Sequence, residues 1–267
     1  AEARAIIDAS RAEKTLPVNL AVDFVDLPPN GSQAILEAHV DVSALAPSGK
    51  ASPFAVDVLG GVYDASGKAI GTAFGRHDEI PADAVARVRR DGVRFQQRLA
   101  LPPGRYEVRL AARDMAKQAL GGSSQWIEIP DLKSGTLALS GVFLSKGAPK
   151  AAGPGGEAAE DIKDVQALRR FTTKDTLYFQ VYAYNLKEEA GAGADAVLQA
   201  QLRQGETLVA ASSPQPVKVE RKDGVLLPQT NGMPLAGLPA GRYALKVVVM
   251  DKRANATASR DIDFSVE

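Results

Sequence analysis

The 267-residue sequence contains no cysteine and only two histidines, His39 and His77. Without cysteine the chain can form neither a disulfide nor a thiolate metal site. The two histidines lie far apart in the sequence, so neither a histidine-based zinc site nor a Ser–His hydrolase is indicated. His39 falls on the polar side of an alternating run, and we expect its side chain to be solvated.

An excess of charge of one sign is also absent, because 32 Lys and Arg residues balance 32 Asp and Glu residues. Nucleic acids and anionic membrane surfaces bind basic proteins, so neither is expected as a partner. No apolar run approaches the roughly 18 residues that a membrane-spanning helix needs. The sequence therefore predicts no membrane span.

Convincing catalytic and cofactor-binding motifs are missing as well. Residues 61–68 approach a phosphate-binding loop, but five residues rather than four separate the glycines, and Ala69 stands where Ser or Thr would bind magnesium. A hairpin turn explains them better. Residues 191–196 imitate a dinucleotide fingerprint without a βαβ setting, so we expect a loop there. We predict no enzyme activity, no cofactor and no metal.

The sequence does contain an internal repeat. Residues 101–114 begin with LPPGRY, and residues 238–251, which lie 137 positions later, begin with LPAGRY. Six of these fourteen positions are identical, where chance gives about one. A repeat of this length corresponds to a domain. We predict two related domains, at residues 15–131 and 132–267, preceded by a helix or linker at residues 1–14.

Apolar and polar residues alternate with a period of two over most of both predicted domains, which is typical of antiparallel strands with one buried face. The strands predicted for the first domain are residues 18–24, 34–42, 54–62, 69–74, 93–99, 106–112 and 123–129. Those predicted for the second are residues 136–144, 176–185, 196–204, 208–211, 217–219, 225–227, 243–250 and 259–266. Short strands separated by turn signals predict a β-sandwich in each domain.

A few segments depart from this alternation. Residues 2–14 carry a thin apolar stripe at helical spacing. Residues 81–92 begin with proline, end with glycine and place two valines on one face, which predicts an inserted helix of about three turns. Residues 146–160 are rich in Ala, Gly and Pro and predict a mobile loop, followed by a helical turn within residues 161–170. The predicted fold is therefore all-β, with two tandem sandwiches, a short N-terminal helix and a small inserted helix.

The repeated motif resembles the turn before strand F of fibronectin type III and immunoglobulin-like domains. In those folds a tyrosine opens strand F and its hydroxyl caps the preceding loop, an arrangement called the tyrosine corner. Tyr106 and Tyr243 match that position. The resemblance implies a sandwich fold and says nothing about function.

The last position of the repeat is an aspartate in both copies, Asp114 and Asp251. We expect these two residues to cap turns rather than to bind calcium.

A second resemblance covers more of the chain. Residues 57–64, 124–126, 137–144 and 256–259 resemble the C-terminal half of acidobacterial proteins called VWFA-related. In that family an N-terminal von Willebrand factor A domain carries a metal-dependent adhesion site, and residues 8–10 do not complete its Asp-x-Ser-x-Ser signature. The resemblance implies an accessory region of a larger extracellular or periplasmic protein, with any adhesion-site metal located upstream.

The candidate ligand surface consists of aromatic residues. Tyr178, Tyr182 and Tyr184 alternate along one predicted strand, and Trp126 should point away from the core face set by Ile127. If exposed, these rings could stack on a sugar or a peptide. Packing against protein is the commoner fate of large aromatic side chains and is favoured here.

Two functions remain open from the sequence. The favoured one is a non-catalytic structural or protein-interaction module of a larger extracytoplasmic bacterial protein. Its partner would be another protein or an upstream domain of the same chain, received at an exposed sheet edge. The alternative is a carbohydrate-binding module that uses Tyr178, Tyr182, Tyr184 or Trp126 to stack on a glycan.

Overall fold

The computed structural model describes residues 15–43, 54–114, 119–148, 167–222 and 224–267. The predicted N-terminal helix and most of the predicted loop at residues 146–160 lie outside these ranges. The chain divides into two compact units, and the division falls between Ile129 and Pro130 rather than at residues 131/132. The segment Val25–Ser32 groups with the second unit, Pro130–Glu267, although the residues directly before and after this segment in the sequence belong to the first unit.

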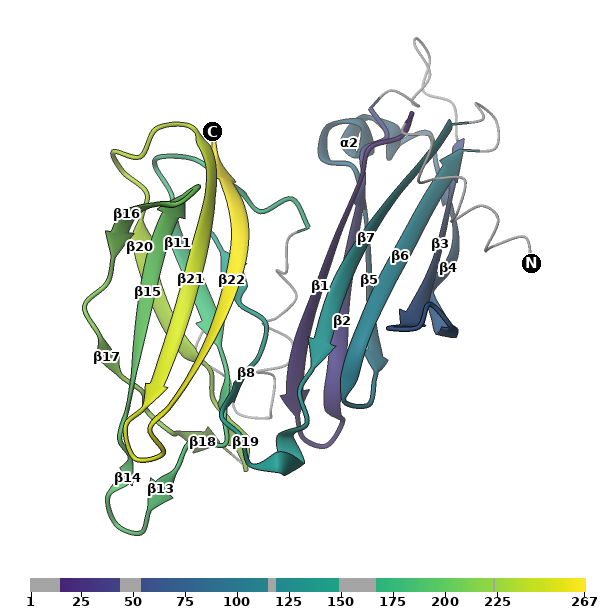
Figure 1. Ribbon diagram of the computed structural model, residues 1–267. Coiled ribbons are helices and arrows are strands. Elements are labelled where there is room, and N and C mark those ends of the chain that lie inside the picture. The colour runs from purple at the N-terminus through teal and green to yellow at the C-terminus, as the bar shows by residue number, and fades with distance from the viewer. Residues whose placement is uncertain (1–14, 44–53, 115–118, 149–166, 223) are drawn as a thin grey trace. The chain divides into compact units, whose positions relative to one another are not determined.

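The first unit is built from two antiparallel sheets (Figure 1). One sheet has the order β1 (Val18–Leu27), β2 (Gly31–Val40) and β5 (Val93–Ala100). The other has the order β4 (Ala69–Ile80), β3 (Phe54–Asp64), β6 (Gly104–Asp114) and β7 (Ala119–Ile129). The alternation of the strands supplies the buried side chains of the core, which include Leu36, Val58, Phe74, Phe95 and Leu110.

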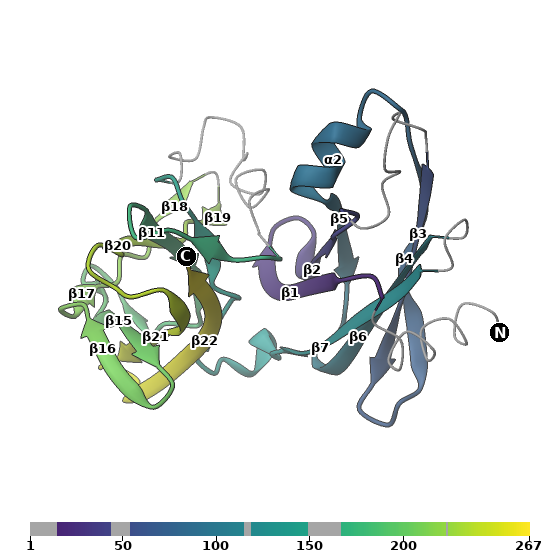
Figure 2. The same cartoon turned by 90° about the horizontal axis from the view of Figure 1, so that it is seen from above.

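A single described helix, α2 (Val85–Asp91), connects β4 to β5 (Figure 2). Its two valines, Val85 and Val88, are both buried, as the sequence pattern predicts. The helix is seven residues long rather than about three turns. It begins four residues after Pro81 because the intervening residues form a turn, and its N-cap residue Ala84 makes no side-chain capping hydrogen bond.

The second unit is also made of β-sheets, three of them formed by only two short strands. The largest sheet has the order β10 (Arg170–Phe171), β22 (Ala256–Val266), β21 (Gly241–Asp251), β15 (Ala196–Gln204) and β16 (Thr207–Ala211), with β17 (Gln215–Pro216) also paired to β15. A three-stranded sheet has the order β20 (Gln229–Pro234), β11 (Thr176–Val181) and β9 (Phe143–Ser145). One hydrophobic core lies within this unit and includes Leu177, Phe179, Leu198, Leu245 and Val247.

The remaining two-stranded pairs and one 3₁₀ turn complete the second unit. The pairs are β8 (Ala138–Leu139) with β12 (Ala183–Tyr184), β13 (Glu188–Glu189) with β14 (Gly193–Ala194), and β18 (Arg221–Lys222) with β19 (Val225–Leu226). The 3₁₀ turn, η1 (Leu132–Ser134), begins at Asp131, whose carboxylate accepts a hydrogen bond from the backbone N–H of Lys133. The fold of the described residues is therefore all-β, with two sandwich-type units and one short helix.

Three predicted strands of the second unit differ from the structure. The run at residues 136–144 is two short strands, β8 and β9, separated by residues 140–142. The predicted strand at residues 176–185 is interrupted at Tyr182, where the chain forms hydrogen bonds with Ser140. The hydroxyl oxygen of Ser140 accepts the backbone N–H of Tyr182, and the backbone N–H of Ser140 donates to the Tyr182 carbonyl. The chain thereby changes its partner from β9 and β20 to β8. Residues 217–219 are not a strand, since pairing with β15 involves Gln215 and Pro216 instead. The run at residues 196–204 is a strand, as predicted.

The repeated motif has the same geometry in both units. The Tyr106 hydroxyl donates a hydrogen bond of 2.9 Å to the Pro102 carbonyl, and the Tyr243 hydroxyl donates one of 2.7 Å to the Pro239 carbonyl. Both tyrosines are buried at the start of their strands, β6 and β21. The hydrogen bond expected of a tyrosine corner is thus present at each copy of the repeat.

At the far end of the second copy, Asp251 caps the turn between β21 and β22. Its Oδ1 accepts the backbone N–H groups of Arg253 and Ala254 at 2.9 and 3.0 Å, and its Oδ2 accepts that of Lys187 at 2.7 Å. Three backbone donors satisfy this fully buried carboxylate. The turn-capping role predicted for Asp251 is confirmed. Asp114 is buried at the corresponding strand end, but the residues that follow it are outside the described ranges.

Candidate functional site

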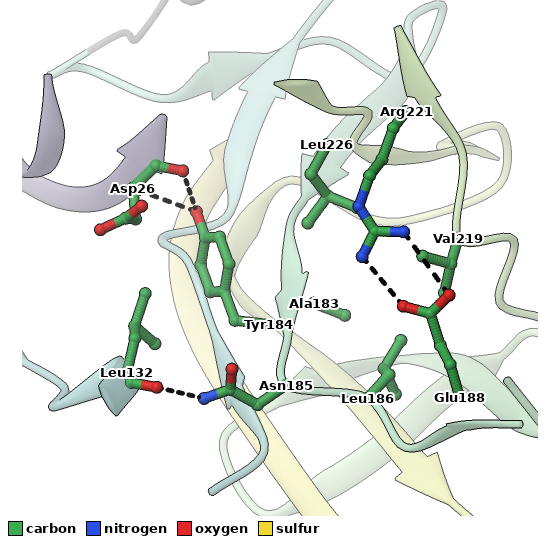
Figure 3. A pocket seen from close by; sticks show the side chains of 10 residues that line it. All are labelled: Asp26, Leu132, Ala183, Tyr184, Asn185, Leu186, Glu188, Val219, Arg221 and Leu226. Atoms are coloured by element: carbon green, nitrogen blue, oxygen red, sulfur yellow. Dashed lines mark hydrogen bonds and ion pairs between the residues drawn. The ribbon is translucent and has the colours of Figure 1, made fainter. Parts of the chain in front are cut away.

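A pocket of about 430 Å³ lies in the second unit (Figure 3). This volume is in the range of small-ligand pockets, roughly 300–1,000 Å³. Its walls combine aliphatic side chains, one tyrosine ring and several polar groups. The lining residues are Asp26, Leu132, Ala183, Tyr184, Asn185, Leu186, Glu188, Val219, Arg221 and Leu226.

Tyr184 supplies the aromatic ring of the pocket and is held in place by hydrogen bonds and ring stacking. Its hydroxyl accepts the backbone N–H of Asp26 at 2.9 Å and donates to the Asp26 carbonyl at 3.2 Å (Figure 3). Its ring is stacked on that of Tyr182, with 6.3 Å between the centroids and 7° between the planes. Burial raises the pKa of the Tyr184 phenol far above its ordinary value. The hydroxyl therefore stays protonated and serves as a fixed hydrogen-bonding group.

Asn185 holds the backbone beside the pocket. It adopts a left-handed conformation with φ of 60°, which asparagine tolerates better than most residues. In this conformation its Nδ2 donates to the carbonyls of Leu132 and Thr136, at 2.8 and 3.0 Å. Asn185 thus connects the end of β12 to η1 and to the residues that lead into β8.

Arg221 and Glu188 form the charged wall of the pocket. The Arg221 Nη2 donates to Glu188 Oε1 at 2.9 Å, and these residues belong to the two small strands β18 and β13. The hydrogen bond from Arg221 lowers the pKa of Glu188, and Glu188 in turn raises the pKa of Arg221. Both side chains are about half exposed, so solvent screening keeps the contribution of this pair to stability small.

The pocket combines apolar walls with a small number of polar and charged groups. Its ten lining residues include no serine, cysteine, histidine or lysine, and its ionisable side chains are those of Asp26, Tyr184, Glu188 and Arg221. Across the described ranges, no group of three or more His, Cys, Asp or Glu side chains is arranged to hold a metal ion. Aliphatic walls with hydrogen-bonding groups at the side suit a ligand that has an apolar body and a polar end.

The four aromatic residues singled out in the sequence do not form one surface. Tyr182 and Tyr184 are buried, with exposed fractions of 1% and 8%, because the interruption at Tyr182 turns this end of the run inward. Tyr178 lies on β11 and packs over Gly232 of β20, where a Cβ atom would be 2.9 Å from the tyrosine ring. For these tyrosines, packing within the protein is the interpretation that the structure supports.

Trp126 belongs to the first unit and is exposed, with 45% of its surface accessible. Its neighbours Ile127 and Ile129 are buried, so the orientation predicted from the alternation of β7 is confirmed. The guanidinium carbon of Arg105 lies 4.7 Å from the centre of the indole ring. This cation–π contact covers part of a ring that otherwise faces solvent.

The prediction that His39 is solvated is wrong. His39 has an exposed fraction of 7%, and its Nε2 lies 2.9 Å from the carbonyl of Asp91 at the end of α2. A Cβ atom on Gly92 would be 2.2 Å from this nitrogen, and Gly92 has φ of 72°, so glycine is required for this close approach. Both faces of β2 are buried here, and alternation within one strand cannot show this.

The sequence pattern also gave no sign of a buried charge at Glu37, which lies two residues from His39 on the same face of β2. Glu37 is almost fully buried, and its carboxylate accepts hydrogen bonds of 3.0 Å from Arg94 Nη2 and from Gln96 Nε2. Both partners come from β5, more than fifty residues away, so only the pairing of the two strands brings them together. This cluster satisfies a carboxylate that would otherwise be costly to bury.

His77 lies in a second charged cluster, on the sheet formed by β4, β3 and β6. Its Nδ1 lies 2.5 Å from Asp57 Oδ1, while Arg113 Nε donates to Asp57 Oδ2 at 2.8 Å. The hydrogen bond to Asp57 raises the pKa of His77. Burial alone would raise the pKa of Asp57, but the hydrogen bonds from His77 and Arg113 outweigh it and lower that pKa. No sequence signal linked these three residues.

Comparison with known proteins gives a fold-level likeness only. No protein-family model matches the chain, and no curated protein matches it. Fibronectin(III)-like modules of CbhA from Clostridium thermocellum are similar over 88% of this chain and 85% of that chain, with 8% identity and a TM-score of 0.23. A Salmonella alpha-2-macroglobulin reacted with methylamine is similar over 95% of this chain and 17% of that chain, with 13% identity and a TM-score of 0.26.

Likenesses at these identities and scores do not define a function for this chain. The resemblance to acidobacterial VWFA-related proteins stays a prediction. Within the described residues, no helix has both the length and the apolar character needed to cross a bilayer.

Proposed function

We propose that this chain is a non-catalytic structural or protein-interaction module of a larger extracytoplasmic protein. The observation that carries this proposal is that the internal repeat occurs as two β-sandwich units, each containing the same tyrosine hydrogen bond. Tandem sandwich domains serve widely as spacers and as binding surfaces. Fold alone does not define function, so the proposal also rests on the binding features of the second unit.

Two features of the second unit suit a protein partner. The pocket beside Tyr184 could hold a side chain that has an apolar body and a polar end. Strand β16 pairs only with β15 among the described strands, carries no charged residue, and exposes Leu208 and Val209 by 53% and 39%. Such an edge can receive an extended strand from another protein or from another domain of the same chain.

The absence of catalysis is tested with the purified chain on a panel of esterase, glycosidase and peptidase substrates. We expect no turnover above that of a heat-unfolded sample. A Glu188→Gln variant, which changes the pocket's ion pair, serves as the matched control. Saturable turnover by the folded chain would contradict the proposal, and its loss in Glu188→Gln would place the activity in the pocket.

The location and the larger protein are tested by the gene sequence upstream of Ala1. We expect a signal peptide followed by a further domain, and an Asp-x-Ser-x-Ser motif in that domain would support the adhesion-type family. A catalytic domain in its place would make these two units appendages of an enzyme. An open reading frame that starts nearby without a signal peptide would contradict the extracytoplasmic location.

Carbohydrate binding is the second candidate function, and only Trp126 favours it. An exposed indole can stack on the apolar face of a sugar ring, and Arg105 beside it supplies hydrogen-bond donors. If this function is real, a glycan array gives a signal that Trp126→Ala abolishes and Leu208→Ala, an equally exposed apolar site in the other unit, preserves. A silent array with the folded chain would exclude it for the glycans displayed.

A further inference from the structure

The chain contains two Asn-Gly pairs, Asn30–Gly31 and Asn231–Gly232. In such a pair the backbone nitrogen of glycine can attack the side-chain amide of asparagine, because glycine has no side chain to hinder the approach and allows unusual backbone angles. The two pairs therefore have the same intrinsic chemistry. Any difference between them in the folded protein reflects their surroundings.

Asn30–Gly31 lies at the junction between an exposed turn and the first residue of β2. Asn30 is an exposed residue of the turn that connects β1 to β2. Gly31 has φ of 65°, and the position that a Cβ atom would take on it has no heavy atom within 4 Å. Water can reach the asparagine amide, and the turn leaves room for the backbone to rotate toward the geometry of attack.

Asn231–Gly232 lies inside a strand. Both residues belong to β20, where Asn231 pairs with Phe179 and Gly232 pairs with Tyr178 of β11. Gly232 is exposed, but the ring of Tyr178 lies beside it, and a Cβ atom there would be 2.9 Å from a ring carbon. Pairing with β11 holds the backbone extended, so attack on the Asn231 amide requires local opening of the sheet.

We infer that Asn30 is a site of spontaneous deamidation in the folded protein and that Asn231 is protected from it. The backbone nitrogen of Gly31 loses its proton and forms a bond to Cγ of Asn30. The Cγ–Nδ2 bond breaks, and its nitrogen leaves as ammonia with the protons it needs from solvent. Water then opens the cyclic imide at either carbonyl, giving aspartate or isoaspartate. Overall, one amide and one water become one acid and one ammonia.

The modification would change the segment that contacts the pocket. Asn30 lies within Val25–Ser32, the segment in which Asp26 Oδ2 accepts the Ser32 hydroxyl at 2.6 Å and the Asp26 backbone pairs with Tyr184. Deamidation adds a negative charge to this segment. The isoaspartate product also lengthens the main chain by one carbon atom, which alters the turn itself.

The inference is tested by incubating the folded chain at 37 °C and mapping its peptides by mass spectrometry, with isoaspartyl methyltransferase as the labelling probe. We expect residue 30 to convert at least about tenfold faster than residue 231. The rate should rise with pH, because the attacking nitrogen must lose a proton. In urea both sites should convert at similar rates, which establishes that Asn231 is competent when the strand is absent.

The Asn30→Gln variant keeps an amide in the exposed turn and should fold like the parent chain, but its longer side chain closes the ring far more slowly. Methyltransferase labelling at residue 30 should disappear in this variant. Equal conversion of residues 30 and 231 in the folded protein would overturn the inference, as would an Asn30 that remains unmodified while Asn231 converts. None of these outcomes depends on whether the chain binds a partner.

Discussion

At the residue scale, some polar interactions of this chain join near neighbours in the sequence, and others join residues on different elements. The hydroxyl of Tyr106 bonds a carbonyl only four residues away, so the motif itself contained the information. His39 and Glu37 alternate with apolar residues along β2, a pattern that predicts a solvent-facing side for both, yet both side chains are buried. Their partners lie on α2 and β5, and a single strand's pattern cannot reveal a second covering layer.

The pair of His77 and Asp57 should make the first unit sensitive to pH. Because the folded-state pKa of His77 is raised, its stabilising contribution is fully present below pH about 6.5 and is lost as pH rises through the raised value. Because the pKa of Asp57 is lowered, its contribution is present above its unfolded-state value and is lost as pH falls through the lowered one. The pair therefore stabilises most between these two limits.

An NMR titration of the His77 ring measures this directly. We expect a pKa above the ordinary histidine value in the parent chain and a fall toward that value in Asp57→Asn, which removes the main hydrogen-bonding partner. Glu79→Gln is the matched control, because Glu79 lies 4.0 Å from the other ring nitrogen and should contribute less. An unchanged His77 pKa in Asp57→Asn would show that the hydrogen bond is not the cause.

At the element scale, the existence of most strands could be predicted, but their ends and partners could not. Strand β7 begins at Ala119, whereas the sequence predicts a start at residue 123. The predicted start is late because the strand contains two consecutive glycines, which resemble a turn in sequence. Gly121 is instead needed for close packing: a Cβ atom on it would lie 1.7 Å from the carbonyl oxygen of Leu16. The adjacent Leu120 carbonyl accepts the backbone N–H groups of Thr15 and Leu16.

Gln125 connects β7 to β1 itself, beyond the contacts that β7 makes with the residues before β1. Its side-chain Nε2 donates to the Val22 carbonyl at 2.8 Å, and its Oε1 accepts the Val22 N–H at 3.1 Å. The Gln125 side-chain amide thus makes with the backbone of Val22 the two hydrogen bonds that a neighbouring strand would otherwise make. A polar side chain in this role has no sequence signature, because glutamine in a strand is ordinarily a solvent-facing residue.

The close approach at Gly121 predicts that Gly121→Ala destabilises the first unit by about 1–3 kcal/mol or more, because the added methyl group overlaps backbone rather than a flexible side chain. Gly71→Ala is the control, since the corresponding position on β4 has no heavy atom within 4 Å. Urea unfolding should show Gly71→Ala within about 0.5 kcal/mol of the parent. Similar losses for the two variants would contradict the packing described for β7.

At the scale of the whole molecule, the repeat was sufficient to predict two all-β domains and a boundary close to the observed one. It was not sufficient to predict that Val25–Ser32 groups with the second unit, because that grouping depends on contacts such as the one between Asp26 and Tyr184. The pocket was missed for the same reason. Its residues come from separate parts of the chain, and no spacing rule connects them.

The central claim is that the chain consists of two related units, each stabilised by its own tyrosine corner. Trp126 is the only tryptophan and lies in the first unit, so its fluorescence reports the unfolding of that unit. Removing either hydroxyl should cost about 0.5–1.5 kcal/mol, because a hydrogen bond to a loop carbonyl is lost. The two substitutions Tyr106→Phe and Tyr243→Phe therefore form a matched pair.

The most direct test is urea unfolding of these two variants, followed by Trp126 fluorescence and by far-ultraviolet circular dichroism in the same samples. We predict that Tyr106→Phe lowers the fluorescence midpoint, whereas Tyr243→Phe leaves it unchanged and lowers the stability seen by circular dichroism. Equal shifts of the fluorescence midpoint in both variants would contradict the account, because the two tyrosines would then stabilise one common structure rather than two units.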